Sequence, residues 1–324
     1  MSLRLTVVSA ATLTLLSLAT MPAQAQNFPA RPITLIVPFA PGGGSDNVAR
    51  LITSKLTERT GKTFIIENKP GGGTNIGNDA AARAVPDGYT ILLGQFTLSV
   101  NPFLYGNLRY NVDKDFIPVV HIANAPTVLI VPATSQVKDV PALTAMAKSQ
   151  PGKLNFGSGG SGTSVHLAGE LFTAMTKTDV VHVPYKGSAP ALTDLMGARL
   201  DMMFDTSTSA LPHIKGGKVR AIAVAAGSRL RELPTVPTFA EQGLKDFDVP
   251  AWYGFVAPTG TPAAAVQWIN AEVNAALKDP ALVAKLDAIG ALSVGGSPAQ
   301  MGEFMKAQSA RWAKVIKDAN IKLD

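Results

Sequence analysis

Residues 33–59 read ITLIVPFAPGGGSDNVARLITSKLTER, and this stretch decides the fold. Ile33 to Ala40 is a continuous apolar run of strand length, ended by Pro41 and three glycines. Ser45 to Arg59 then repeats apolar residues at helical spacing. A buried strand, a glycine turn and an amphipathic helix in this order are typical of parallel α/β sheets.

The alternation of strand and helix continues along almost the whole chain. Further strands are predicted at Phe64–Glu67, Tyr89–Gly94, Ile117–Ala123, Thr127–Val131, Lys153–Phe156, Val180–Val183, Met202–Phe204, Val219–Val224 and Trp252–Ala257. Helices separate most of these strands, and three more are predicted after residue 262. No short-period repeat suggests a solenoid or propeller, and the alternation predicts sheets covered by helices.

Two places suggest that the chain crosses between lobes. Asn124-Ala125-Pro126 separates two adjacent predicted strands, and a proline-rich segment at 233–238 precedes the strand Trp252–Ala257. We therefore predict an α/β protein of two lobes, each a doubly wound mixed sheet. Lobe one comprises residues 26–123 plus 249–324, and lobe two comprises residues 124–248. Two crossings between the lobes suit a hinge.

Residues 1–25 resemble a secretory signal. Arg4 provides the positive charge, Leu13 to Leu18 lie in the apolar region, and Ala23-Gln24-Ala25 is a small-x-small cleavage site. Cleavage after Ala25 would deliver the mature chain to the periplasm. No later segment approaches the length of apolar sequence that a membrane span needs.

The composition excludes several classes of site. The chain has no cysteine, which removes disulfides, thiolate metal sites, cysteine nucleophiles and lipoprotein acylation. Its four histidines are widely spaced and predict no metal centre. The net charge of +6 is scattered, without basic runs interleaved with aromatics, so we expect no nucleic-acid partner. No cofactor and no catalytic residue are predicted.

The glycine turn after the first strand is the first candidate binding site. Glycines let the backbone turn tightly and bring bare N–H groups to a ligand, while the following helix points its positive end at the same place. Ser45 is the expected N-cap of that helix. The alternative is a plain, capped turn with no ligand. The residues predicted to bind here are Phe39, Ala40, Gly43, Gly44, Ser45 and Asp46.

A second turn of the same kind follows Lys153–Phe156. Its predicted binding residues are Ser158, Gly162, Thr163 and Ser164. Gly157, Gly159 and Gly162 formally satisfy a dinucleotide fingerprint, but an exported chain has no obvious dinucleotide supply. His166, near the start of the next helix, is expected to play a core or supporting role. Two such turns, facing one another beyond the carboxyl ends of their strands, would hold one anion from both sides.

Three further residues lie where strands end. Gln95 and Phe96 follow the third strand and would provide a side-chain amide and an aromatic wall. Asp205 follows Met202–Phe204 and would either contact a ligand or cap the next helix. Both readings of Asp205 remain open at this stage.

With these motifs in place, the chain closely resembles the Bug family, the receptors of tripartite tricarboxylate transporters. The resemblance extends over essentially the whole mature chain. The motifs that carry it are Arg31-Pro32-Ile33, Pro38 to Asp46, Glu67-Asn68-Lys69-Pro70-Gly71, Pro86-Asp87-Gly88-Tyr89-Thr90, Asn101-Pro102-Phe103-Leu104-Tyr105, Gly157 to Ser164, His166-Leu167-Ala168-Gly169-Glu170, Val183-Pro184-Tyr185-Lys186-Gly187, Leu233 to Thr238 and Trp252-Tyr253-Gly254.

The resemblance implies a Venus-flytrap receptor of the type II-like periplasmic binding protein fold. It implies that one carboxylate of a small organic acid lies at the loops 39–46 and 158–164, and that the ligand passes to a membrane permease of one large and one small subunit. We expect a monomer. The alternatives are a sensory binding protein for the same ligands and an exported hydrolase that uses Ser45, Ser161 or Ser164.

The segment from Gly94 to Ser99 departs from the pattern of the family. Relatives commonly carry small polar residues and a histidine here, whereas this chain has Phe96 and Leu98. Because the segment is implied to face the variable end of the ligand, the two side chains favour an aromatic or longer apolar carboxylate over citrate. A dicarboxylic acid is the other candidate.

Overall fold

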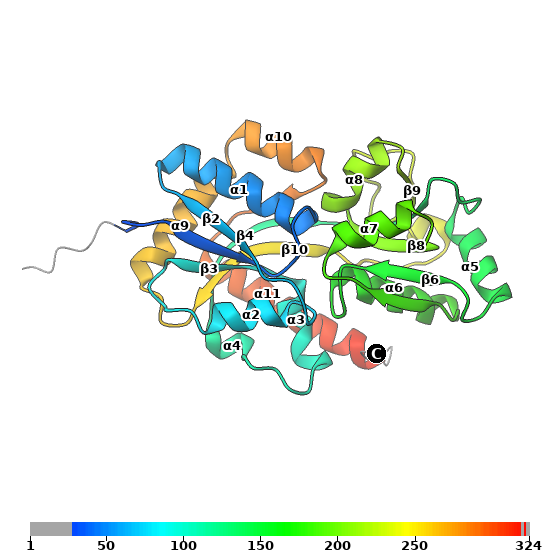
Figure 1. Cartoon of the computed structure of the whole chain (residues 1–324), viewed down its shortest axis with the longest axis horizontal. Helices are drawn as coiled ribbons and strands as arrows, with labels where there is room; N and C mark the ends of the chain where they lie inside the picture. The colour runs from blue at the N-terminus through cyan, green and yellow to red at the C-terminus, as the bar shows by residue number, and fades with distance from the viewer. Residues whose placement is uncertain (1–27, 319–320, 322–324) are drawn as a thin grey trace, which may run out of the picture.

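The computed structural model describes residues 28–318 and Ile321, and these form two lobes side by side (Figure 1). The lobes are built on separate mixed sheets, with six strands in lobe one and five in lobe two among the described residues. Helices cover the faces of both sheets. The predicted class, a two-lobed α/β fold with a mixed sheet in each lobe, is confirmed. The predicted signal and its cleavage site lie outside the described residues.

The sheet of lobe one has β10 and β3 at its centre. Its spatial order is β11 (Leu292–Ser293), β4 (Phe116–Ala125), β10 (Ala251–Pro258), β3 (Thr90–Gln95), β1 (Ile33–Val37) and β2 (Phe64–Asn68). β1 pairs in parallel with β2 and β3, whereas β10 runs antiparallel to both β3 and β4. β1 is apolar apart from Thr34 and almost wholly buried, as expected for a strand covered on both faces.

The sheet of lobe two repeats this scheme with fewer strands. Its order is β7 (Val181–Pro184), β6 (Asn155–Ser158), β8 (Met202–Thr206), β5 (Thr127–Pro132) and β9 (Val219–Ala225). β6 is parallel to β7 and β8, and β5 is antiparallel to β8 and β9. β1 and β6, which lead into the two glycine turns, are both parallel to their neighbours.

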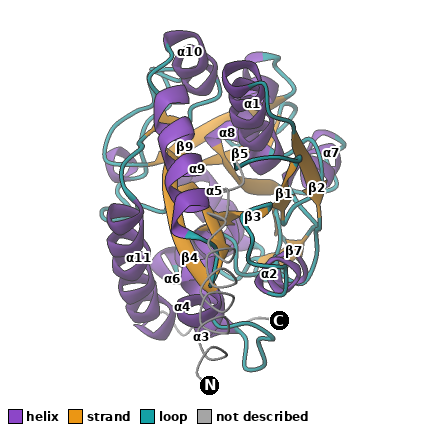
Figure 2. Ribbon diagram, turned by 90° about the vertical axis from the view of Figure 1, so that its left-hand side faces the viewer, coloured by secondary structure: helices purple, strands orange, loops and turns teal. Residues whose placement is uncertain are grey.

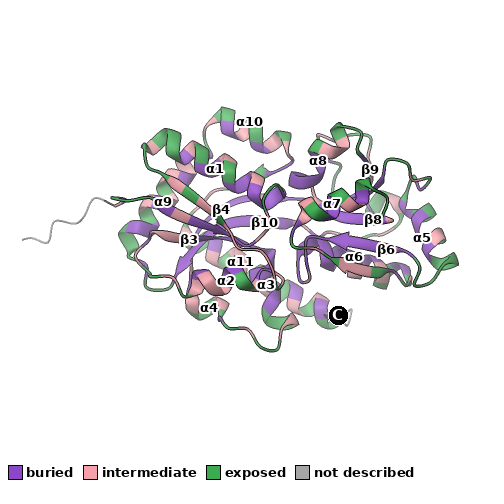
Figure 3. Ribbon diagram, viewed as in Figure 1, coloured by how far each residue is buried: buried purple, intermediate pink, exposed green. Residues whose placement is uncertain are grey.

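Helices cover the sheets from both sides. Lobe one has α1 (Gly44–Thr60), α2 (Asn75–Ala82), α3 (Phe96–Leu104), α4 (Val112–Asp115), α9 (Ala263–Ala276), α10 (Pro280–Ala288) and α11 (Pro298–Asp318). Lobe two has α5 (Val140–Ser149), α6 (Ser164–Thr176), α7 (Ser188–Met196), α8 (Ser207–Lys215) and a short 3-10 turn, Ala240–Gln242. α9 and α11 both contact β4, as the side view shows (Figure 2). The strands form the buried interior, while the helices carry the exposed residues (Figure 3).

The two chain segments that cross between the lobes are hydrogen-bonded to each other. Pro126 alone separates β4 from β5, and the chain returns to lobe one just before β10. The Thr127 hydroxyl on the outgoing crossing donates to the Val249 carbonyl on the returning one, at 2.6 Å. A hinge made of two bonded strands permits rotation of the lobes while keeping them in register. The lobe boundaries at 123/124 and 248/249 remain a prediction.

Two details differ from the sequence expectations. The segment after β3 forms helix α3, which was not predicted, because six of its nine residues are buried and the stretch has no polar face. The N-cap of α1 is Gly43, in extended conformation and without a side-chain cap, so the expected capping role of Ser45 is wrong. Among the described residues, no helix combines the length and apolar character needed to cross a membrane.

Candidate functional site

The two lobes enclose a small cavity at the carboxyl ends of their parallel strands. Its volume is about 30 Å³, which accommodates about two water molecules. The residues that line it are Phe39, Gly43, Gly44, Ser45, Gln95, Phe96, Thr97, Gly159, Thr163, Ser164, Val165, Ser188, Thr206, Ala251 and Tyr253. Both lobes contribute, and none of these lining residues is a lysine or an arginine.

Five helices begin at the wall of the cavity. They are α1 at Gly44, α3 at Phe96, α6 at Ser164, α7 at Ser188 and α8 after its N-cap Thr206. The first N–H groups of a helix have no partner within it, and its N-terminus carries a partial positive charge. Helix ends from both lobes therefore offer donors and a positive field to one place. This arrangement suits an anion without a basic side chain.

The first glycine turn is held from within lobe one by Asp46. This carboxylate is 2% exposed and accepts from the Gly42 N–H at 2.9 Å, from Arg50 Nε at 2.7 Å and from Asn68 Nδ2 at 3.1 Å. Burial alone would raise the pKa of Asp46, but the hydrogen bonds from Arg50, Gly42 and Asn68 outweigh it and hold that pKa below its usual value. Asp46 thus shapes the turn from behind the cavity wall.

The second glycine turn is held by neutral groups. The fully buried Ser158 hydroxyl accepts from the Gly160 N–H at 3.1 Å, and the Gly162 N–H donates to His166 Nδ1 at 3.1 Å. Thr163 is the N-cap of α6, and its hydroxyl oxygen accepts from the His166 N–H. Two of the predicted contacts, Ser158 and Gly162, are thereby engaged inside lobe two.

Unpartnered polar atoms mark the wall formed by α3. Gln95 Nε2 and Thr97 Oγ1 are buried and make no hydrogen bond, and both residues line the cavity. A buried donor or hydroxyl without a partner is uncommon and is normally satisfied by water or a ligand. The ring of Phe96 lies edge-on against Trp312 at a centroid distance of 4.8 Å, and Leu98 is not among the lining residues. This wall is therefore more polar than the sequence indicated.

Asp205 lies behind the cavity on the side of lobe two. It is fully buried, and its Oδ1 accepts from the Ser188 hydroxyl at 2.6 Å and from the Thr206 N–H at 2.9 Å. Burial without a cationic partner outweighs these bonds and raises the pKa of Asp205 to about 6. Asp205 neither lines the cavity nor caps α8, so its role is to orient Ser188.

The lobes meet directly around the cavity, so this is a closed conformation. The Ala40 N–H donates to the Lys186 carbonyl at 3.1 Å, and the hydroxyls of Tyr253 and Thr208 are 2.8 Å apart. Gly44 lies so close to lobe two that a Cβ atom there would be 2.7 Å from Thr206 Oγ1. Lobe separation is the way for a ligand to enter.

Larger hollows lie elsewhere, and two of them border the lobes' contact region or lobe one. One of about 490 Å³ continues outward from Phe39 and Gly159, past Gly71–Thr74 and Lys186, toward the cleft mouth. The other, of about 1060 Å³, is a mainly apolar groove on lobe one between α3, α9 and α11. Its charged residues have mixed sign, namely Asp113, Glu303 and Lys306. The volume of a cavity alone therefore does not identify the candidate site. The N–H donors of helix N-termini, which converge on the small cavity, distinguish it from these hollows.

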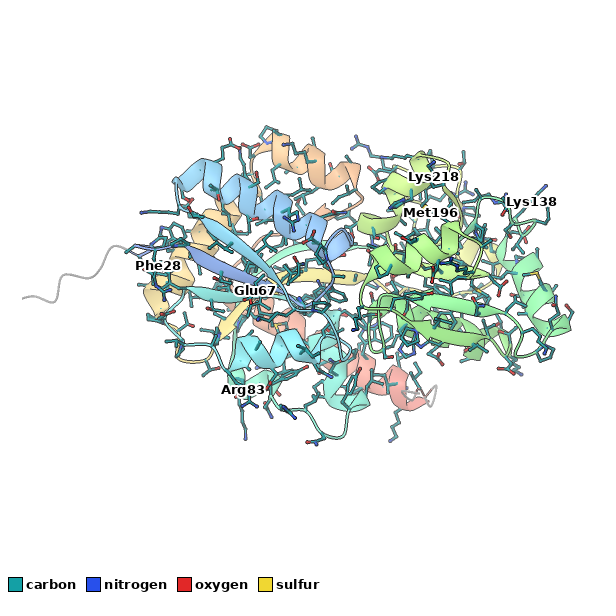
Figure 4. The ribbon with its side chains drawn as sticks, viewed as in Figure 1. Phe28, Glu67, Arg83, Lys138, Met196 and Lys218 are labelled. Carbon is teal, nitrogen blue, oxygen red and sulfur yellow. The ribbon has the colours of Figure 1, made fainter. Side chains whose placement is uncertain are left out.

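The described residues hold no cluster of three or more His, Asp or Glu side chains placed to bind a metal ion. Basic residues are spread over the surface. Lys138 and Lys218, for example, lie on lobe two away from the cleft (Figure 4). The field in the cavity thus comes from backbone dipoles, with the general positive charge of the protein as background.

Comparison with known proteins places this geometry in a family. Residues 48–321 match the family described as the tripartite tricarboxylate transporter family receptor. The chain belongs to this receptor family. It is 44% identical to a Pseudomonas sp. (strain P51) protein named for the tcbD-tcbE intergenic region, over 89% of this chain and 86% of that one. It is 36% identical to the protein BugT of Bordetella pertussis, over 93% of each chain.

A solved structure shows the same fold. The R. palustris protein Rpa4515, determined with adipate, superimposes on the receptor with a TM-score of 0.89 at 37% identity, covering 91% of this chain and 99% of that one. The resemblance of the sequence to Bug proteins is thereby confirmed. The family comprises periplasmic solute-binding proteins rather than enzymes.

The structure gathers most of the predicted residues around one cavity. Those that line it are Phe39, Gly43, Gly44, Ser45, Gln95, Phe96, Thr163 and Ser164, and those that do not are Ala40, Asp46, Ser158, Gly162 and Asp205. Lining residues that the sequence reasoning missed include Thr97, Ser188 and Thr206. Ser188 and Thr206 also begin helices after strands of the parallel set, so that position was the available signal. Contact of each residue with a ligand remains a prediction.

Proposed function

We propose that this receptor captures a small organic carboxylate between its lobes and performs no chemistry on it. The observation that carries the proposal is the convergence of five helix N-termini on one enclosed cavity without a basic side chain. Fixed N–H donors in a dehydrated site bind a carboxylate strongly. The adipate complex of the relative Rpa4515 supports this class of ligand.

The size of the cavity indicates how binding proceeds. Ligand pockets usually measure hundreds of cubic ångströms, whereas the closed cavity here holds about 30 Å³. We infer that the ligand enters an open form, docks on one lobe and is then covered by the other. A small hinge rotation at Thr127 and Val249 widens the cavity around the ligand while Gly44 and Tyr253 stay in contact with lobe two.

The unpartnered polar atoms of the α3 wall indicate which class of carboxylate binds. Gln95 Nε2 is a donor, Thr97 Oγ1 is both donor and acceptor, and each lacks a partner. An aromatic ring placed there would leave both unsatisfied, at a cost of about 1–3 kcal/mol for each group. We therefore favour a dicarboxylate, whose second oxygen-bearing end reaches Gln95, over an aromatic acid.

The proposed function includes delivery of the bound ligand to a membrane permease. The mature chain, cleaved after Ala25, would act in the periplasm as a monomer and pass its ligand to a permease with a large and a small membrane subunit. Membership of the transporter receptor family supports this partner. Neither a sensory role nor hydrolysis through Ser45, Ser161 or Ser164 has a supporting observation in the structure.

The test is calorimetry and thermal shift on the mature, ligand-stripped receptor. The panel holds C4 to C8 dicarboxylates including adipate, their diamides, benzoate, citrate, amino acids and sugars. At 100 times its dissociation constant a ligand adds about 2.7 kcal/mol of stability. A dicarboxylate should stabilise the protein while its diamide does not. Stabilisation by neutral sugars alone, or by benzoate in preference to every dicarboxylate, would contradict the proposal.

A second experiment uses variants of Gln95 to test the role of the α3 wall in ligand binding. Gln95→Leu keeps the volume of the side chain but removes the donor, and Gln95→Glu keeps its shape but adds a negative charge. Both should weaken dicarboxylates by about tenfold, the value of one charge-assisted hydrogen bond. A matched monocarboxylate, which does not reach this wall, should be unaffected by Gln95→Leu.

A further inference from the structure

Two stacked histidines lie directly behind the second glycine turn. The rings of His166 and His182 are 4.0 Å apart between centroids at an interplanar angle of 25°. Phe156 stacks on the other face of His182 at 4.8 Å. His166, on α6, is 1% exposed, and His182 comes from β7, so the stack joins two elements of lobe two.

Each ring is bonded to the turn. His166 Nδ1 accepts directly from the Gly162 N–H at 3.1 Å. His182 Nε2 lies 2.7 Å from the Ser158 hydroxyl, whose oxygen already accepts from the Gly160 N–H. The two rings therefore act on two backbone N–H groups, one directly and one through a serine.

The hydrogen bonds define the tautomers. Because a backbone N–H can only donate, His166 Nδ1 must be an acceptor, and the proton of this neutral ring lies on Nε2. The Ser158 hydroxyl lies 2.7 Å from His182 Nε2, and because its oxygen already accepts from Gly160 we infer that its hydrogen is donated to Nε2, which places the ring proton on Nδ1. Burial lowers the pKa of His182 to about 3, in keeping with a neutral His182 ring.

The bonds decide which donors of the turn face the cavity. Engaging the N–H groups of Gly160 and Gly162 turns them away from it and leaves the first amides of α6, at Ser164 and Val165, at the cavity wall. If His166 did not accept, the Gly162 donor would be buried without a partner or would turn toward the ligand space. Without His182, the Ser158 hydroxyl that accepts from Gly160 would lose the ring that orients it.

We propose that His166 and His182 are positioning residues for carboxylate binding: as a neutral stacked pair of fixed, opposite tautomers, they orient the β6–α6 turn so that its helix-end amides meet the ligand. Neither ring contacts the ligand. The inference rests on the proposed carboxylate function, and it names residues that determine the affinity of the site from outside its wall.

The first experiment reads the tautomers in the ligand-free wild-type receptor, by long-range ¹H–¹⁵N correlation of the histidine rings between pH 5.5 and 8. The expected result is a proton on Nε2 of His166 and on Nδ1 of His182. Glu170, whose Oε1 lies 3.6 Å from His166 Nε2, is the acidic group that faces the pair and is kept in all samples. The opposite tautomer on either ring, or a charged ring at pH 7, overturns the proposal.

The second experiment uses matched substitutions and adipate as the calorimetric probe. Asn places an oxygen near the position of a histidine Nδ1, and Gln places one near Nε2. His166→Asn and His182→Gln should therefore bind adipate within about threefold of the wild type, whereas His166→Leu and His182→Leu should lose about tenfold. Equal losses in the Asn and Leu variants would show a packing role and overturn the proposal, as would unchanged affinity in the Leu variants.

A failure of the proposed carboxylate function gives a different experimental result from a failure of the histidine proposal. If the wild type binds neither adipate nor any other carboxylate of the panel, the carboxylate proposal fails. The tautomers, measured without ligand, still decide whether the histidines hold the turn as stated. If a Leu variant does not fold, the same spectra of the wild type, with the Asn and Gln variants, decide the outcome.

Discussion

The two halves of the cleft share one backbone plan but are held by different chemistry. In lobe one, a charged carboxylate, Asp46, holds the turn before α1 and is balanced by Arg50. In lobe two, the turn before α6 is held by Ser158 and two histidine rings. The N-terminus of α1 thus carries an acidic residue in its first turn, whereas the N-terminus of α6 carries none.

This difference indicates where the charge of a ligand should lie. A carboxylate at a helix N-terminus uses part of the positive field that the helix offers. Asp46 already does so for α1, and the Asp205 carboxylate lies beside the starts of α7 and α8, so the unbalanced field is that of α6. We expect the ligand carboxylate to lie closer to the amides of Ser164 and Val165 than to those of Ser45 and Asp46. Lobe one would contribute shape and the donor of Gln95.

The prediction with the largest expected effect tests whether the two lobes must close on each other for the ligand to bind. An added Cβ at Gly44 would lie 2.7 Å from Thr206 Oγ1 and 3.1 Å from the Ser209 nitrogen, both in lobe two. Gly44→Ala should therefore block closure and weaken dicarboxylate binding by at least about 100-fold, equivalent to about 3 kcal/mol of overpacking. Small-angle scattering should show a larger radius of gyration than that of the wild type.

Gly43→Ala is the matched control for this steric test. Its added Cβ would meet its nearest neighbour, the Ser188 nitrogen, at 3.6 Å, an ordinary contact. Affinity should remain within about threefold of the wild type, because no overpacking arises. Equal binding by the Gly43→Ala and Gly44→Ala proteins would mean that the ligand is held by one lobe alone.

The second effect concerns the charged half. Asp46→Ala leaves the Gly42 N–H and Asn68 without their acceptor and should lower the free energy of unfolding by about 2–3 kcal/mol at pH 7. Because the pKa of Asp46 is lowered in the folded state, its stabilisation is complete above pH 4 and disappears as the pH falls through the lowered pKa. Chemical denaturation of both proteins at pH 7 and pH 3 measures this difference. A deficit that persisted unchanged at pH 3 would exclude the ionised carboxylate as its source.

The third effect concerns lobe two, where the buried carboxyl of Asp205 has no cationic partner. Its pKa of about 6 exceeds the usual 3.8, so its contribution to stability is present below pH 4 and is lost as the pH rises through 6. Asp205→Asn keeps an acceptor for Ser188 and removes the buried charge. The variant should be more stable than the wild type by about 2 kcal/mol at pH 7.5, and the gain should vanish near pH 4. Thermal denaturation across this range checks it, and a gain that does not change with pH would refute it.

The comparison also shows what a sequence can predict here. β1, α1 and the two glycine turns were predictable because strand, glycine and helix signals follow one another within a few residues. α3 was not, since its buried residues show no polar face, and the direction of Phe96 toward Trp312 depends on α11, more than 200 residues away in the chain. Asp46 was expected in the site because it belongs to the turn. Only the positions of Arg50 and Asn68 show that its oxygens are already engaged.

The smallest expected effect tests how the halves are joined. Tyr253, on β10 of lobe one, is fully buried and is hydrogen-bonded to Thr208 of lobe two at 2.8 Å. Tyr253→Phe removes that one bond without altering the packing and leaves Thr208 its other partner, Thr206. Loss of about 1 kcal/mol from the closed form should weaken a dicarboxylate about fivefold.

Tyr105→Phe is the control, because its 3.4 Å bond to the Ser161 carbonyl lies at the wider mouth and should contribute less. If both variants bound as the wild type does, the closed form would be maintained by the helix ends and the ligand rather than by bonds between the lobes, and the field at α6 would then account for most of the affinity.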